Sequence, residues 1–68
     1  ERESFIFYRS FYEAVRDLPK EIQIEVFTAV IEYGLYGRLP DKMKPFANGI
    51  FTLIKPSLDA NIARYENG

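Results

Sequence analysis

The spacing of apolar residues along the chain predicts three helices. The central helix covers Leu18 to Tyr36, where two apolar rows appear on a helical wheel of about 100° per residue. The first row consists of Ile22, Val26, Ala29, Val30 and Tyr33, and the second of Ile24, Phe27, Ile31 and Leu35. Because the rows together cover more than half of the circumference, this helix is expected to contact partners on at least two sides.

The ends of the central helix carry recognisable signals. Asp17 is a candidate N-cap, and Pro19 falls in the first turn, where a missing amide does no harm. Gly37 is the expected C-cap in the left-handed conformation, while Gly34 is expected to allow a neighbouring helix to approach closely. The remaining face is mainly acidic and indicates either a solvated surface or a docking strip for a basic partner: it carries Glu21, Glu25, Thr28 and Glu32.

The first predicted helix covers Ser4 to Leu18, with Ser4 as its N-cap. Its apolar positions recur at helical spacing: Phe5, Tyr8, Phe11, Tyr12, Val15 and Leu18. A short strand over Phe5 to Tyr8 is the alternative, since these residues favour strands. We favour the helix, because its period continues to Leu18 and no second strand is evident for pairing.

The third predicted helix covers Pro45 to Glu66. One stripe runs along it through Ala47, Phe51, Ile54, Leu58, Ile62 and Tyr65, widened by Phe46, Ile50 and Leu53. Pro56 removes one helical amide and should bend the helix there, while the stripe keeps its phase. We therefore expect an all-α fold and a single domain over residues 1–68. It would be a small antiparallel three-helix bundle whose kinked third helix crosses the other two.

Composition narrows the chemistry. The 68 residues include neither cysteine nor histidine, which disfavours disulfides, zinc sites and the usual nucleophile–base pairs. No cofactor and no metal are expected, and we predict a protein that is not an enzyme. No apolar run is long enough to span a membrane, and the lack of cysteine fits a cytoplasmic location.

A basic loop connects the second and third helices. Arg38, Lys42 and Lys44 lie close together here, next to Tyr36. Cations beside an aromatic ring are suited to holding a phosphate and stacking a base, so weak nucleic-acid binding is one hypothesis. A loop that only improves solubility is the other, and the net charge of −1 favours it. Leu39 and Met43 are expected to tuck under the loop.

The aromatic content suggests association with a protein. Six Phe and five Tyr are more than a core of this size easily hides, and exposed aromatic patches are typical of interfaces. A partner protein or a second copy of the chain would bury the remainder. The candidate contact residues are Ile6, Phe7, Phe11, Tyr12, Tyr36 and Tyr65.

Four stretches of the chain resemble a family of uncharacterised domains found in phage and prophage proteins. They are Ser4 to Ala14, Glu32 to Gly37, Leu53 to Asn61 and Arg64 to Gly68. The resemblance implies an N-terminal accessory or interaction module, with some members described as replication-associated. Around Pro56, Asp59 and Asn61 are then expected to form a polar network that fixes the bend and bonds to the loop or to the first helix. A ligand site is the alternative.

Overall fold

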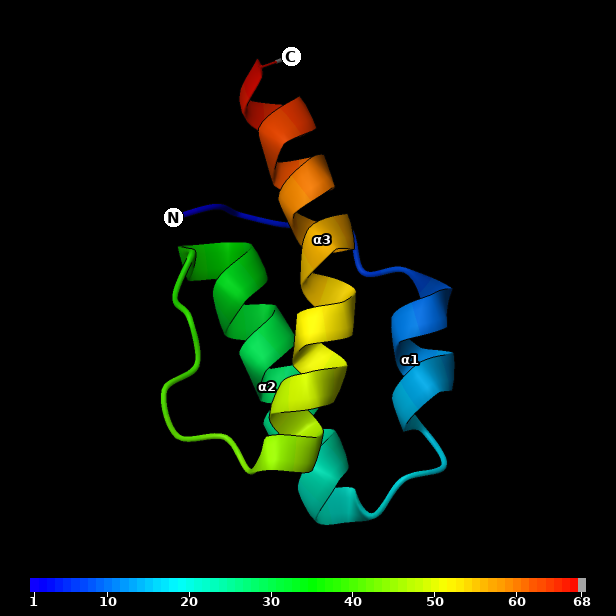
Figure 1. Cartoon of the computed structure of the whole chain (residues 1–68). Coiled ribbons are helices and arrows are strands. Elements are labelled where there is room, and N and C mark those ends of the chain that lie inside the picture. The colour runs from blue at the N-terminus through cyan, green and yellow to red at the C-terminus, as the bar shows by residue number, and fades with distance from the viewer. Residues whose placement is uncertain (68) are drawn as a thin grey trace.

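The computed structural model describes residues 1–67, apart from the side chains of Tyr65 and Asn67. Three helices follow one another: α1 (Arg9–Val15), α2 (Lys20–Tyr36) and α3 (Pro45–Asn67), as Figure 1 shows. No strand occurs in the described part of the chain. The predicted all-α, three-helix fold is confirmed. Residue 68 lies outside the described residues.

The beginning of the chain differs from both predictions made for it. Helix α1 starts at Arg9 instead of Ser4, and residues 1–8 form an irregular segment with neither helix nor strand. The amide of Arg2 donates to the carbonyl of Leu35 at the far end of α2, 2.7 Å away. The ring of Phe5 lies against Gly34, where an added Cβ would come within 2.5 Å of it. Gly34 therefore does admit a close neighbour, but the neighbour is this segment and no helix.

Helix α2 also begins later than expected. Pro19 takes the N-cap position with extended backbone angles and makes no side-chain cap, so the assignment of Asp17 was wrong. The turn is held instead by the side-chain amide of Gln23, which donates to the carbonyls of Arg16 and Leu18 at 2.9 and 2.8 Å. At the other end Gly37 has φ +70° and donates to the carbonyl of Tyr33, which confirms the predicted cap.

Helix α3 runs as one helix through Pro56, whose ring is exposed. The core joins its stripe to residues of the other two helices: Ala47, Phe51, Ile54 and Leu58 from α3, Val26, Ala29 and Val30 from α2, and Phe11 and Val15 from α1. Phe46 and Leu53, expected to widen the stripe, are exposed. Tyr65, its expected last member, has a side chain outside the described ones.

The helices are not arranged as the predicted antiparallel bundle. Helix α1 runs opposite to α2, but α2 and α3 run in the same direction, with residues 37–44 returning beside them (Figure 1). Contacts show the same order: Lys44 bonds to Glu21 near the start of α2, and Asp59 bonds to Tyr33 near its end. Eight extended residues reach at most ~26–29 Å, and the 17 residues of α2 measure ~25 Å. The loop is therefore just long enough to bring the chain back to the start of α2.

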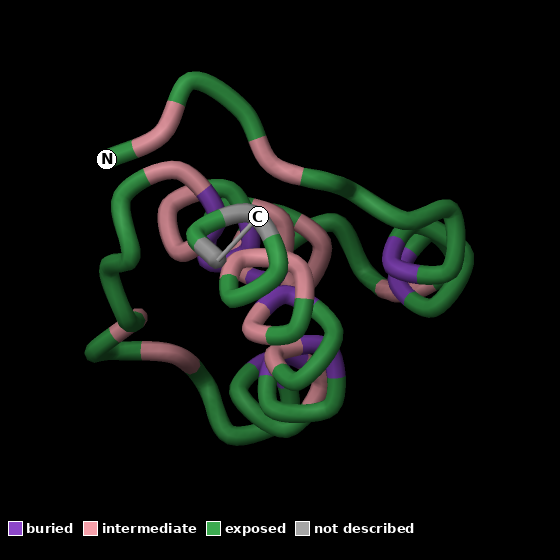
Figure 2. The backbone as a smooth tube through the Cα atoms, turned by 90° about the horizontal axis from the view of Figure 1, so that it is seen from above, coloured by how far each residue is buried: buried purple, intermediate pink, exposed green. Residues whose placement is uncertain are grey.

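The main helical interface lies between α2 and α3, and a smaller one joins α1 to α2. In Figure 2 the coil of α1 stands apart from the α2–α3 pair, with its buried residues turned towards that pair. We had expected the third helix to cross both of the others. It packs mainly against α2 instead.

Candidate interaction surface

Three of the four sides of α2 are occupied by other parts of the chain. Helix α3 packs on the side of Ala29, Val26 and Tyr33, and the segment before α1 packs on the side of Gly34. The loop of residues 37–44 covers the side that carries Glu21 and the other acidic residues. On the helical wheel the fourth side is centred on Ile24 and Ile31. These two side chains are 66% and 44% exposed.

Aromatic rings extend this open side towards α1. The ring of Phe27, on the same helix face as Ile24 and Ile31, is half-buried. Its centroid lies 6.0 Å from that of Phe7 and 6.4 Å from that of Tyr12, which stacks on it with an interplanar angle of 15°. Phe7 and Tyr12 are themselves 41% and 50% exposed. These five residues, Phe7, Tyr12, Ile24, Phe27 and Ile31, are called the apolar face below.

The apolar face has the pattern of a helix-packing seam. Along α2 its residues lie at spacings of three and four, the spacing by which one helix presents a ridge to another. Aromatic and branched aliphatic side chains of this kind form the centres of protein interfaces. Burying them would remove apolar surface from water, which is favourable in proportion to the area covered.

The predicted contact residues are divided by the structure. Phe7 and Tyr12 belong to the apolar face. Phe11 is only 3% exposed and is part of the core, so its expected exposure was wrong. Ile6 is exposed but lines a small cleft of about 140 Å³ beside Phe5 and Leu58, away from the apolar face. The side chain of Tyr65 lies outside the described ones.

Sequence reasoning missed Ile24 and Ile31, which were expected to be covered by other parts of the chain as members of the second apolar row. The signal was present in the width of the two apolar rows, since a helix with two neighbours need not bury both rows completely. The rows did not show that α3 would pack against the first row and leave the second row partly exposed to solvent.

The loop spreads the predicted nucleic-acid residues along α2, and two of the three cations are paired within the chain at opposite ends of that helix. Arg38 approaches Glu32 at 3.5 Å and lies over the ring of Tyr36, 5.4 Å from its centroid. Lys44 bonds to Glu21 at 3.2 Å. For Lys42 no ion pair occurs within the described residues.

The acidic side of α2 is thus paired with the loop of the same chain. The sequence had indicated either a solvated surface or a docking strip for a basic partner. Besides the Glu21 and Glu32 pairs, the carboxylate of Glu25 accepts a bond from the amide of Lys44 at 3.0 Å. Such exposed pairs contribute little to stability individually. Their consequence is that the loop follows the acidic side. Met43 packs against the core there, as expected, while Leu39 stays exposed and does not tuck under the loop.

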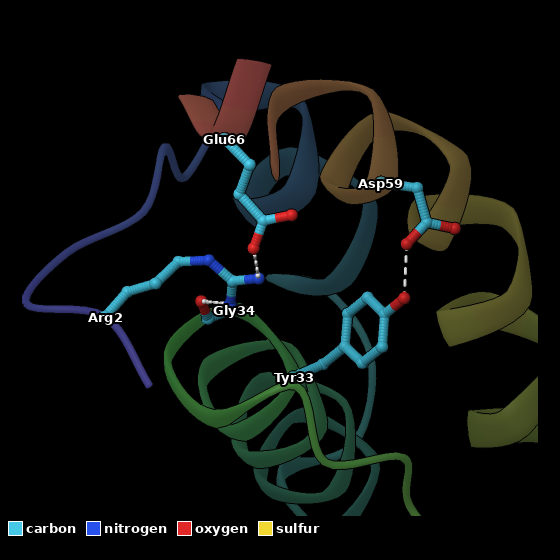
Figure 3. A network of polar contacts seen from close by, with 5 residues as sticks. All are labelled: Arg2, Tyr33, Gly34, Asp59 and Glu66. Carbon is cyan, nitrogen blue, oxygen red and sulfur yellow. Dashed lines mark hydrogen bonds and ion pairs between the residues drawn. The ribbon is translucent and has the colours of Figure 1, made fainter. Parts of the chain in front are cut away.

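A polar network joins the ends of α2 and α3 (Figure 3). The hydroxyl of Tyr33 donates to the carboxylate of Asp59, which also accepts from the ammonium of Lys55 at 2.9 Å. The bond from Tyr33, followed by that from Lys55, lowers the pKa of the Asp59 carboxyl. Partial burial and the bond to Asp59 raise the pKa of the Tyr33 hydroxyl.

The N-terminal segment is tied to the same end of the molecule. The guanidinium of Arg2 donates to the carbonyl of Gly34 at 2.8 Å and pairs with Glu66 at 3.4 Å (Figure 3). The amide of Asn61 donates to the hydroxyl of Tyr8 at 2.8 Å, immediately before α1. The expected network around Asp59 and Asn61 is therefore present, with α2 and the entry to α1 as its partners.

These polar groups join parts of the chain, and two of them, Arg2 and Asn61, also line the small cleft beside Phe5 and Leu58. Among the residues that the structure describes, no three acidic side chains are grouped so that they could hold a metal ion. Within the same residues, no helix has the length and apolar character needed to cross a membrane.

Comparison with known proteins places the chain in a family. Residues 4–68 match the model of a family described as "Family of unknown function (DUF6291)". Neither the comparison with curated proteins nor that with solved structures gives a significant match. The match agrees with the resemblance to an uncharacterised family and spans all three helices. The chain therefore belongs to the family of unknown function DUF6291.

Proposed function

We propose that the chain is a non-enzymatic protein-interaction module that docks a helix of its partner on the apolar face. One observation carries this proposal: Ile24 and Ile31, at helix-packing spacing, remain exposed on a helix whose other three sides are occupied. A second helix laid along this side would complete the burial of α2. This mode of recognition relies on apolar anchors at successive helical turns.

The phage or prophage context, and with it a role in DNA replication, stays a prediction from the resemblance. Membership of DUF6291 assigns no activity to the chain. An interaction module is compatible with such a role, because an accessory protein acts through the partner that it contacts. Nucleic-acid binding by the loop also stays a prediction, and the pairing of Arg38 and Lys44 with α2 gives it no added support.

Site-specific photo-crosslinking tests the proposal in cells that express the protein naturally. A photoreactive amino acid replaces Ile31 on the apolar face, or Leu53 on α3 as a matched control. Leu53 is 82% exposed and has the same size and polarity as the residue under test. We expect covalent protein adducts from position 31 and few from position 53. Equal yields at both positions, or none at 31, would contradict the proposal.

A further inference from the structure

We propose that the small cleft between the N-terminal segment and α3 binds a small monocarboxylate whose apolar part is about the size of a benzene ring. The cleft has a volume of about 140 Å³ and shares no residue with the apolar face, so this site is independent of the helix-docking function. Its lining combines apolar and polar side chains: Phe5, Ile6, Leu58 and Ile62 with Arg2 and Ser4. The bonding of Arg2 and the shape of the lining together identify the ligand.

The guanidinium of Arg2 has one bonding position that the chain does not fill. The side chain is 14% exposed, and its Nη1 donates to the carbonyl of Gly34 at 2.8 Å. Nη2 approaches one carboxylate oxygen of Glu66 at 3.4 Å, on another side of the group (Figure 3). Nε is closed to solvent and has no hydrogen-bond partner among the described residues. A buried donor without a partner is costly, so a ligand that accepts from Nε would remove this cost.

The unfilled position indicates a carboxylate. In the planar guanidinium, the N–H of Nε and one N–H of Nη2 are parallel, and this edge matches the two oxygens of a carboxylate. Glu66 meets only the Nη2 half of the edge, from a side chain that is 62% exposed. Its distance of 3.4 Å is longer than the roughly 2.7–3.2 Å of typical N–H···O bonds. A ligand carboxylate can therefore displace Glu66 and accept from both nitrogens.

The apolar lining determines the rest of the ligand. Leu58 and Ile62 lie one turn apart on α3, while Phe5 and Ile6 line the cleft from the N-terminal segment. A cavity of about 150 Å³ with apolar walls is large enough for one benzene ring. A cleft of about 140 Å³ therefore suits an aromatic ring or a short branched chain attached to the carboxylate.

The other polar groups at the cleft agree with a ligand that has one negative charge. No acidic side chain is among the described residues that line it. The side-chain amide of Asn61 donates to the hydroxyl of Tyr8 and the carbonyl of Ser57, so both of its N–H groups are used. The hydroxyl of Ser4 can donate a further bond at the same cleft. The charge of Arg2 is thus the main polar attraction of the site.

Titration of the isotope-labelled chain with sodium benzoate, followed by NMR, tests the proposal. We expect saturable shifts of the backbone amides around the cleft and of the Arg2 Nε–H signal, with a dissociation constant on the order of 1 mM. Benzamide has the ring without the charge, and acetate has the charge without the ring. Both should bind at least about tenfold more weakly. If either binds as well as benzoate, the cleft does not recognise both parts of the ligand and the proposal fails.

Substitutions of Arg2 and Glu66 should act in opposite directions. Arg2→Lys keeps the charge but removes the planar edge, and should weaken benzoate binding about tenfold or more. Glu66→Gln removes the competing charge and should tighten binding about two- to fivefold, because an exposed ion pair of this kind is weak. Arg16→Lys, the same change at an exposed arginine outside the cleft, should have no effect. Circular dichroism verifies that each variant is folded.

The gain expected for Glu66→Gln cannot come from a damaged fold, so it keeps the test decisive even if Arg2→Lys is unstable. Benzoate binding that Glu66→Gln leaves unchanged or weakens would show that Glu66 does not compete for Arg2, and would overturn the assignment. Absence of saturable shifts in the wild type at about ten times the expected dissociation constant would overturn the cleft as a ligand site.

Discussion

At single positions, the absence of a side chain matters as much as the side chains themselves. Gly34 has no Cβ, and this allows the ring of Phe5 to lie directly on α2. The contact sits beside the bonds from Arg2 to the carbonyls of Gly34 and Leu35. Gly34 thereby gives Phe5 its place on α2, and together with the Arg2 bonds this holds the segment before α1 along the end of α2.

Gly34→Ala should destabilise the fold by about 1–2 kcal/mol, because the new Cβ forces the Phe5 ring outward. This loss exceeds the gain of about 0.5–1 kcal/mol that alanine normally brings to a helix. Gly49→Ala is the matched control, since a Cβ at that α3 position meets no atom within 4 Å. It should stabilise the fold, and urea unfolding measures both. Equal effects of the two changes would show that Phe5 does not need the space.

At the level of helices, the junction between α1 and α2 is held by a side chain in place of a cap. Pro19 holds the N-cap position of α2, but no side chain forms a capping bond there. Two bonds from the side chain of Gln23, inside the helix, hold the preceding turn instead. The junction positions α1 so that Tyr12 reaches Phe27. A local bond therefore supports the geometry of the apolar face.

Gln23→Met keeps the length of the side chain but removes both donated bonds, and should cost about 1–2 kcal/mol of unfolding free energy. Gln23→Glu should cost more, because its carboxylate would face two carbonyl oxygens. In an open first turn the same carboxylate would be favourable to the helix dipole. Urea unfolding of both variants measures the difference. A Gln23→Glu protein as stable as the wild type would rule out this role.

For the molecule as a whole, the parallel course of α2 and α3 brings the distant ends of the chain together. Tyr33, Lys55 and Asp59 join the two helices, and Arg2 joins the N-terminal segment to Glu66. The same arrangement leaves the loop on the acidic side of α2 and the apolar face open. Stability and the proposed interaction thus depend on one topology.

The stability of the fold should depend on pH through Asp59, whose pKa is lowered by Tyr33 and then by Lys55. A lowered pKa means that the ionised carboxylate stabilises the folded state at neutral pH. This contribution starts to fall near the unfolded pKa of about 4 and is lost as the pH drops through the folded pKa. Wild type should therefore exceed Asp59→Asn in unfolding free energy near neutral pH, and the difference should shrink in acid. A difference that stays constant from about pH 6 to about pH 2 would contradict this role.

Local pattern was enough to predict the three helices, the cap at Gly37 and most of the core stripe of α3. These features depend on residues within a few turns of one another, and helical periodicity records them directly. Phe7 and Tyr12 were found in the same way, as aromatic residues in excess of the core. The network at Asp59 and Asn61 was also expected, including a bond to the predicted first helix at Tyr8, but the bond from Tyr33 of α2 to Asp59 was not.

The direction of α3, the irregular start of the chain and the exposure of Ile24 and Ile31 were decided by tertiary structure alone. Each depends on contacts between residues far apart in sequence: Phe5 with Gly34, Lys44 with Glu21, and Asp59 with Tyr33. An apolar row shows that a helix can be covered on that side. Which side is covered depends on where the connecting segments are long enough to bring the other helices.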